Sequence, residues 1–525
     1  MRTNKKIYTG IFLFFLFLIF IKVDYRTAEP NSKGTTDDTS YYFHSSTIAK
    51  DFDLDYSNQI DQNNNEQFLN KRTNTYVPIH PFGTGLLSSP VHFLGILVQK
   101  LFKVKELSYF IYSLSSLIYL AISYNLLAKI LSENIKHSKV VFTVSFFGSG
   151  SLYYATERFS MTHSYEIFAT TFLLYLSFKA KNNFKNSTKF NLNSINFLIG
   201  FLSFVFLSIR WSNYFIFLIP LFYFSLFENL KSYSRKILRN IYYYLGLAIG
   251  CIFFLGHTFF IYGFFTFNPT DIYSSSSSLK RIDEMFIGNF SPDFVNFIVI
   301  NITNFIKILF SFEFGLFFIS PVLFMLFIFP VYLIYKKEFL NCLILLAVLI
   351  LPIGTVLLWQ TTASSFGYRY LFSLVPIGLM LIFKEGLSKV WLRYLLYFGI
   401  FSIISTLFFE TNQYTILSEQ INTFGILHKY SAPKFVLGVI TSIFTISSYL
   451  KIFFTSYLGV FFIKLLLFFN LDGPFYDLIS RLGYWNEDVE GLFIYTQNFY
   501  SLNYIFLFLI FYLFKKSFNN LNHFN

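Results

Sequence analysis

The chain contains little cysteine and little charge. Both of its cysteines, Cys251 and Cys342, lie inside apolar runs, so we expect neither a disulfide framework nor a thiolate metal site. Charged residues make up only 13% of the 525 residues, whereas 54% are hydrophobic. A water-soluble domain of this length cannot hide that much apolar surface in one core. The composition therefore predicts that lipid is the solvent for most of the chain.

The basic excess, a formal net charge of +13, is spread along the chain. Lys and Arg recur as small clusters between apolar segments, whereas a protein that binds nucleic acid is expected to gather them in one patch. The distribution indicates membrane topology. We therefore expect the lipid bilayer, and not nucleic acid, as a partner.

Apolar runs long enough to cross a bilayer recur along the whole chain and predict an all-α polytopic bundle of roughly 12–14 transmembrane helices. The first run follows Met1–Lys6 without a convincing cleavage site, so we interpret it as a retained anchor. The pairs within 193–228 and 435–470 can alternatively be re-entrant. The predicted spans are 7–23, 107–131, 139–155, 164–178, 193–209, 211–228, 241–262, 315–335, 339–358, 370–383, 392–409, 435–450, 452–470 and 500–514.

The basic clusters set the orientation of this bundle. With the N-terminus in the cytoplasm, they all fall on the cytoplasmic side, as the positive-inside rule requires. The clusters are Lys136 and Lys139; Lys179, Lys181, Lys185 and Lys189; Lys231, Arg235, Lys236 and Arg239; Lys336 and Lys337; Lys384, Lys389 and Arg393; Lys451; and Lys515 and Lys516.

Four connections then fall on the opposite, extracytoplasmic side: 24–106, 263–314, 410–434 and 471–499. The first is long and rich in Asp and Glu, and a connection of that length indicates a function of its own. Within the second, 296–311 is expected to form an interfacial helix. We divide the chain into a core, 1–430, and additional C-terminal spans, 431–525, which carry the outer loop 471–499.

An adjacent acid pair marks the first outer loop. Asp37 and Asp38 open a predicted amphipathic helix that runs toward Lys50. Thr36 or Asp37 can cap such a helix through a side-chain oxygen. Neighbouring carboxylates near an interface can also have their pKa values pushed apart, which leaves one of them suited to act as a general base.

Several segments of the chain carry a recognisable pattern. The first outer loop contains Asp37-Asp38-Thr39-Ser40-Tyr41-Tyr42, Asp51-Phe52-Asp53-Leu54-Asp55 and Tyr76-Val77-Pro78-Ile79-His80-Pro81-Phe82-Gly83; the later segments are Glu157–His163, Ser208–Trp211, Gly315–Pro321, and Trp359 with Ser365–Tyr370. The loop segments resemble the first extracytoplasmic loop of GT-C-fold glycosyltransferases, the polyprenyl-phosphate-sugar-dependent enzymes related to protein mannosyltransferases and aminoarabinose transferases. The later segments are similar to segments of bacterial members in the same order, and together the similarities cover roughly 1–390.

The resemblance implies a GT-C-like transmembrane bundle whose long first outer loop contains interfacial helices. It also implies transfer of a glycosyl unit from a polyprenyl-phosphate donor. In that family the first acid of the loop pair is assigned as the catalytic base, which by position is Asp37. Asp38 stands where the family more often has Glu, and it can share or take the role. Direct displacement inverts the anomeric centre.

Arginine suits the leaving group of such a reaction. The departing polyprenyl phosphate carries developing negative charge, and the guanidinium fork donates hydrogen bonds to phosphate in parallel. Arg210 and Arg369 are the candidates. The alternative for each is a snorkelling or aromatic-stacked interface arginine.

Four further side chains complete the expected substrate-binding set: Tyr42, His80, Glu157 and His163. His80 precedes a proline and a glycine-rich turn, which projects its imidazole from a rigid bend. For His163, beside Glu157 at the start of a span, a structural hydrogen bond is the alternative. Asp53-Leu54-Asp55 is formally a DxD motif, but nucleotide sugars are absent outside the cell, so we assign no metal site and require no metal cofactor; a divalent metal at these acids is the alternative, which we do not favour.

The favoured hypothesis is therefore a GT-C-type glycosyltransferase in a bacterial-type cytoplasmic membrane, with its site on the extracytoplasmic face. Its acceptor is a glycan, a lipid or a protein. The alternative is a transporter or flippase of a lipid-linked glycan, which predicts ionisable groups along a path through the midplane. The predicted spans hold almost none away from their ends. A third possibility, a scaffold for polysaccharide assembly, predicts tolerance to changes at Asp37.

Overall fold

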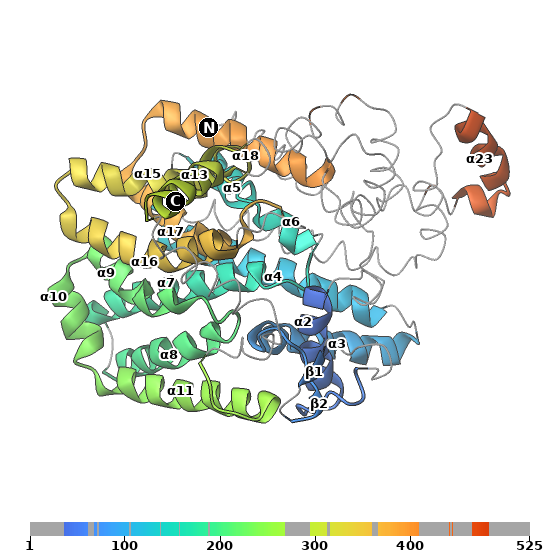
Figure 1. Cartoon of the computed structure of the whole chain (residues 1–525), viewed down its shortest axis with the longest axis horizontal. Coiled ribbons are helices and arrows are strands. Elements are labelled where there is room, and N and C mark those ends of the chain that lie inside the picture. Colours follow the sequence, from blue (N-terminus) through green and yellow to red (C-terminus); the bar gives the residue numbers. More distant parts are fainter. Residues whose placement is uncertain are drawn as a thin grey trace.

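The computed structural model describes residues 36–60, 68–70, 73–103, 107–136, 138–156, 158–186, 189–267, 294–311, 315–359, 366–408, 440, 444, 462 and 465–481. This part of the chain is mostly helical, as predicted. The sheet within it has two short antiparallel strands, β1 (Leu69–Asn70) and β2 (Thr75–Tyr76). Figure 1 shows many of the helices side by side in a bundle, with β1 and β2 near one end and the short helix α10 (Leu230–Tyr233) at the other.

The first outer loop folds into a helical unit beside this bundle. α2 (Thr36–Lys50) packs on α3 (Gly83–Phe102), which packs in turn on α4 (Leu107–Ile130). The predicted helix after the acid pair therefore exists, but it is not amphipathic, because 38–47 are all buried. Several of its polar side chains form hydrogen bonds or ion pairs with other elements, and these contacts offset the cost of burying polar groups.

The rest of the bundle follows in chain order, and some predicted spans are interrupted. Span 139–155 breaks around Gly150, whose φ of +91° suits glycine. Span 315–335 breaks before Pro321, which starts a new helix. The remaining helices are α5 (Lys139–Phe147), α6 (Ser151–Thr156), α7 (His163–Asn186), α8 (Lys189–Leu207), η4 (Tyr214–Leu218), α9 (Ile219–Phe227), η5 (Ser234–Leu238), α11 (Ile241–Tyr262), α13 (Phe294–Phe310), α14 (Leu316–Ile319), α15 (Pro321–Tyr335), α16 (Phe339–Trp359), η7 (Arg369–Leu374), α17 (Val375–Glu385), α18 (Lys389–Phe408) and α23 (Asp472–Arg481).

Four helices in the described part are long and apolar enough to cross a membrane: α3, α4, α11 and the Phe339–Leu357 stretch of α16. α3 is a correction, because it lies within 24–106, which the sequence predicts to be an outer loop. Ser, His and Thr side chains on its buried face interrupt the apolar run in the sequence, so the pattern there does not predict a span. Predicted spans 7–23 and 500–514, and loop 410–434, lie outside the described residues, as do most of 435–450, 452–470, 471–499 and 263–314.

Glycines set the closest helix packing, between α8 and α11. A Cβ added at Gly246 would lie 2.1 Å from the Phe197 carbonyl oxygen, and one at Gly200 would lie 2.3 Å from the Tyr243 carbonyl oxygen. Small residues at such crossings let two backbones approach closely inside a membrane. This packing fixes α11, whose last turn reaches the first outer loop.

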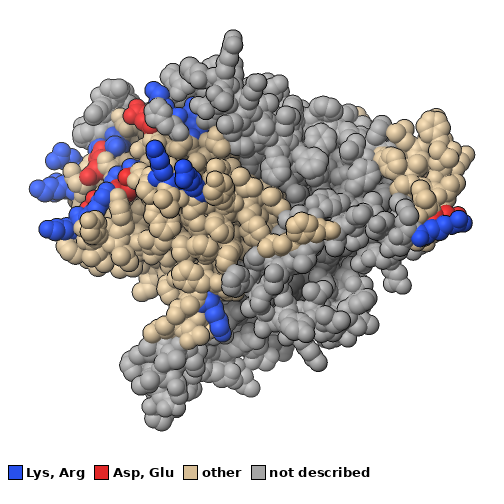
Figure 2. All heavy atoms as spheres, turned by 90° about the horizontal axis from the view of Figure 1, so that it is seen from above, with Lys and Arg blue, Asp and Glu red and all other residues tan. Residues whose placement is uncertain are grey.

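The described basic clusters converge at one end of the bundle. The Lys181 ammonium donates to the Phe227 carbonyl, and the Lys236 ammonium pairs with Glu228 at 2.9 Å. Lys384 lies over the Phe227 ring. Figure 2 shows most of the blue side chains on the visible face gathered at this end. Connections far apart in sequence thus bring their positive charge together, as the topology argument expects.

Candidate active site

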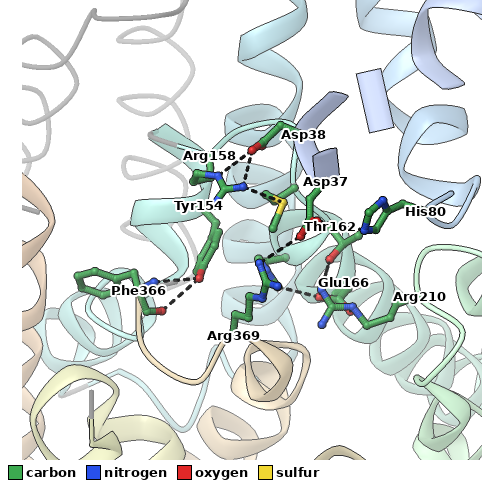
Figure 3. A network of polar contacts seen from close by, with 12 residues as sticks. Asp37, Asp38, His80, Tyr154, Arg158, Thr162, Glu166, Arg210, Phe366 and Arg369 are labelled. Carbon is green, nitrogen blue, oxygen red and sulfur yellow. Dashed lines mark hydrogen bonds and ion pairs between the residues drawn. The ribbon is translucent and has the colours of Figure 1, made fainter. Parts of the chain in front are cut away.

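Asp37 lies in the first turn of α2, with each carboxylate oxygen paired to a different side chain (Figure 3). Oδ1 lies 3.1 Å from His80 Nε2, and Oδ2 lies 3.3 Å from Arg369 Nη1. The Asp37 side chain is 30% exposed. The structure thus joins the predicted base, the predicted histidine and one predicted arginine, which come from three separate segments.

Charge determines the ionisation of Asp37. Burial raises the pKa of its carboxyl group, but His80, Arg369 and Arg158 outweigh that effect and hold the pKa well below its usual range. Asp37 is therefore a carboxylate throughout the neutral pH range. It can accept a proton in a transition state, but it is a weak base while these partners remain in place.

Asp38 has a different environment from its neighbour. Its Oδ2 accepts hydrogen bonds from both Nε and Nη2 of Arg158, the first at 2.9 Å. Both side chains are almost fully buried. This pair joins the start of α2 to the segment between α6 and α7, and it leaves Asp38 poorly placed to meet a substrate.

A second carboxylate, Glu166, organises the neighbouring half of the network. Oε1 accepts from Arg210 Nε at 2.9 Å and from Asn213 Nδ2 at 2.6 Å. Oε2 accepts from His163 Nδ1 at 3.0 Å and from the Thr162 hydroxyl at 3.2 Å. With four donors on a side chain that is only 1% exposed, Glu166 is held as a fully coordinated anion.

Arg210 and Arg369 meet at one aromatic ring. Their guanidinium carbons lie 4.6 Å and 5.3 Å from the centre of the Tyr370 ring, which is within the range of a cation–π contact. Arg210 Nη1 and Arg369 Nε are both buried N–H donors that find no hydrogen-bond partner among the described residues. Unused donors on two neighbouring cations are suited to receive an anion.

The backbone at His80 is fixed from two sides. Its carbonyl oxygen accepts from His44 Nε2 at 2.8 Å and from the Tyr262 hydroxyl, at the end of α11, at 3.2 Å. Because a carbonyl only accepts, His44 carries its proton on Nε2, and its Nδ1 accepts from the Tyr56 hydroxyl at 2.7 Å. Burial lowers the pKa of His44 to about 3, so His44 stays neutral in the folded protein.

The structure does not bring every predicted residue to this network. Tyr42 packs instead among the rings of His92, Tyr109 and Tyr112. Glu157 lies outside the described residues.

The formal DxD motif forms turns. Asp53 accepts from the Thr47 hydroxyl at 2.9 Å, and Asp55 accepts from the Ser57 backbone N–H at 3.0 Å. Both aspartates are exposed. Within the described residues, no group of three His, Cys, Asp or Glu side chains is placed to hold a metal ion.

Sequence reasoning missed the residue with the most partners, Glu166. It also gave no role to Thr162, Asn213 or Tyr370. The signal for Glu166 was present: an acid inside an apolar run, three residues after a histidine, lies on the same helix face as that histidine. Two of the candidate residues, Arg210 and His163, contact Glu166 in one buried cluster, and their role in substrate binding stays a prediction.

These features define a class of protein: a mostly helical chain with helices of membrane-spanning length and a buried ionic network near one end of the bundle. Comparison of the chain with protein-family models, with curated proteins and with solved structures finds no match. Function must therefore be argued from the site.

Proposed function

We propose that the protein is a GT-C-type, inverting glycosyltransferase that moves a glycosyl unit from a polyprenyl-phosphate donor to an acceptor at the outer face of the membrane. One observation carries the proposal. The partly exposed carboxylate of Asp37 contacts Arg369. Arg369 and its neighbour Arg210 each have a buried N–H group without a hydrogen-bond partner among the described residues. A base and an anion-binding pair are thus adjacent, as the reaction needs.

The orientation follows from two helices that connect the basic end to the ionic network. α7 carries Glu166 near its start and Lys181 fifteen residues later, about 22 Å away along the helix. α11 begins near Lys236 and ends at Tyr262, which spans about 32 Å, close to the thickness of the hydrocarbon core of a bilayer. With the lysines inside, the network faces outward, whether or not α3 crosses the membrane.

The donor phosphate is expected to bind to Arg210 and Arg369. Their unpartnered N–H groups supply hydrogen bonds to its oxygens, and their charge opposes the negative charge that grows as the phosphate leaves. The Tyr370 ring holds the two guanidinium groups close to each other. Glu166 keeps Arg210 in place from the other side, so we assign it as a positioning residue.

Asp37 is the proposed base. As the acceptor oxygen attacks the anomeric carbon, the bond from that carbon to the phosphate oxygen breaks and its electron pair leaves with the phosphate. The acceptor proton passes to Asp37. When Arg369 turns to the phosphate, Asp37 loses one of the charges that depress its pKa, and it becomes a stronger base where it is needed. Asp38 is assigned to hold Arg158 and thereby the start of α2.

The test is transfer from a synthetic prenyl-phosphate sugar by purified protein, with acceptors drawn from lipid, glycan and peptide pools. Asp37→Asn is expected to lower kcat by about 10²–10⁴-fold, because it removes the base. Arg369→Gln should weaken donor binding as well as turnover. Asp55→Asn, an acid in the same loop but outside the network, is the matched control.

Transfer by Asp37→Asn at the rate of Asp55→Asn would overturn the assignment of the base. Wild-type protein that transfers no sugar from any prenyl-phosphate donor, yet moves a labelled glycolipid between leaflets of vesicles, would favour the alternative, a transporter or flippase. The observation that keeps this alternative open is the burial of Glu166 within a helix of the bundle.

A further inference from the structure

A cavity of about 280 Å³ lies away from the ionic network, at the far end of α2. Its lining comes from three helices and includes Lys50 and Lys100, and we call it the lysine pocket. Lys50 ends α2, thirteen residues after Asp37, which places it about 20 Å from that carboxylate. The lining residues are Lys50, Ile96, Gln99, Lys100, Ser108 and Tyr109.

The polar groups of the lysine pocket suit an anion. Two ammoniums, an amide and two hydroxyls can all donate hydrogen bonds, and the lining contains no Asp or Glu. Within the part of the chain that the structure describes, neither Lys50 nor Lys100 forms an ion pair. Two positive charges outside any ion pair attract a compact anion such as phosphate to a concave site, although Asp51, next to Lys50, lines the neighbouring cavity.

The rim of the pocket is apolar on one side. Lys100 shares a helix face with Leu97 and Phe93, three and seven residues earlier on α3. Leu97 is 42% exposed, Leu101 77% and Leu94 54%, so a strip of hydrocarbon continues outward from the lysine. A ligand that fits both parts joins an anionic group to a hydrocarbon chain.

A second cavity of about 210 Å³ adjoins the first and shares Lys50 with it. Ser46, which is 1% exposed, lines this cavity, and its hydroxyl has no hydrogen-bond partner in the described part of the chain. The carbonyl oxygen of the Gln59 side chain, also in its lining, is likewise unpartnered. Hydroxyl groups of a bound molecule would satisfy both atoms.

We infer that the lysine pocket binds a lipid phosphodiester with a hydroxyl-bearing headgroup. The phosphate lies between Lys50 and Lys100, the hydrocarbon chain follows Leu97 and Leu101, and the headgroup hydroxyls enter the cavity beside Ser46. Two sources share this chemistry, a glycerol phospholipid of the membrane and a prenyl-phosphate sugar. The distance from Asp37 makes this a second lipid site that does not depend on the proposed transferase activity.

The experiment measures lipid binding to the full-length protein in neutral detergent, by native mass spectrometry and by the thermal shift on titration. The probes are phosphatidylglycerol, zwitterionic phosphatidylcholine and a prenyl-phosphate hexose. Phosphatidylglycerol is expected to bind and phosphatidylcholine is not. Lys50→Gln and Lys100→Gln should each weaken binding about tenfold, the loss of one charge-assisted hydrogen bond.

Lys103→Gln is the matched control, because this exposed lysine follows α3 directly but does not line the pocket. Ile96→Trp fills the cavity without changing charge and should also abolish binding. Equal binding of both phospholipids, or a loss with Lys103→Gln as large as with Lys100→Gln, would overturn the inference. Preference for the prenyl-phosphate hexose over phosphatidylglycerol, lost in the Lys50 and Lys100 variants, assigns the pocket to lipid-linked sugars; the reverse preference assigns it to the membrane lipid.

Discussion

Replacing Glu166 by Gln tests the network without any assumption about substrate. The change keeps the size of the side chain but removes its charge and turns one acceptor oxygen into an NH₂ group. That group faces donors, whichever way the amide is oriented, because both Glu166 oxygens accept only from N–H and O–H groups. Arg210 then loses its one carboxylate partner within the described part of the chain.

The expected cost is large because the pair is buried. Glu166 is 1% exposed and Arg210 11%, and removing one partner of a buried ion pair costs about 3–5 kcal/mol, mostly because it leaves the other charge uncompensated. Glu133→Gln, at an exposed position on the opposite side of the bundle from the network, should change the free energy of unfolding by less than about 0.5 kcal/mol.

The assay is equilibrium unfolding in detergent micelles, followed by circular dichroism. Because the two charges depend on each other, Glu166→Gln combined with Arg210→Gln should cost less than the sum of the single changes, with a coupling of about 1–3 kcal/mol. If Glu166→Gln were as stable as Glu133→Gln, or if the double variant were additive, the network described here would be wrong.

Two further predictions concern stability. His44 takes up a proton on unfolding, because its pKa rises from about 3 to about 6.5; its contribution to the free energy of unfolding should therefore fall by about 2 kcal/mol between pH 8 and pH 5, and the stability of His44→Gln should fall by about that much less than the stability of the wild-type protein over the same range. On α11, Gly246→Ala places a methyl group against a carbonyl oxygen and should lower the melting temperature. Gly256→Ala meets nothing within 4 Å and should raise it slightly through helix propensity, so equal effects would contradict the α8–α11 packing.

Part of this structure was predictable because its signals are local or periodic. The apolar run 107–131 became α4, and the run 241–262 became α11, because a helix is the simplest way to satisfy backbone groups in lipid. The pairing of Asp37 with Arg369 joins segments 332 residues apart in sequence. It was anticipated only through sidedness and family resemblance, which placed both residues on one face of the membrane.

The rest depended on tertiary contacts that sequence patterns do not carry. α3 mixes serines and a histidine into an apolar helix, and only its packing against α2 and α4 shows why those polar groups are tolerated. Asp37 and Asp38 are adjacent, yet helical geometry turns them about 100° apart, toward different partners. Tyr42 lies in an aromatic cluster because α2 is enclosed on nearly all sides, which its composition did not reveal.

The two hydrogen bonds on the His80 carbonyl hold one side of the network more rigidly than the other. His44 and the Tyr262 hydroxyl both donate to this carbonyl oxygen, so a bound molecule cannot displace the His80 backbone without breaking both hydrogen bonds. Arg369 stands on a short 3₁₀ turn behind Gly367, whose φ of +66° gives the backbone a pivot there. When a bulky ligand binds, we therefore expect the segment that carries Arg369 to move, while the backbone at His80 stays in place.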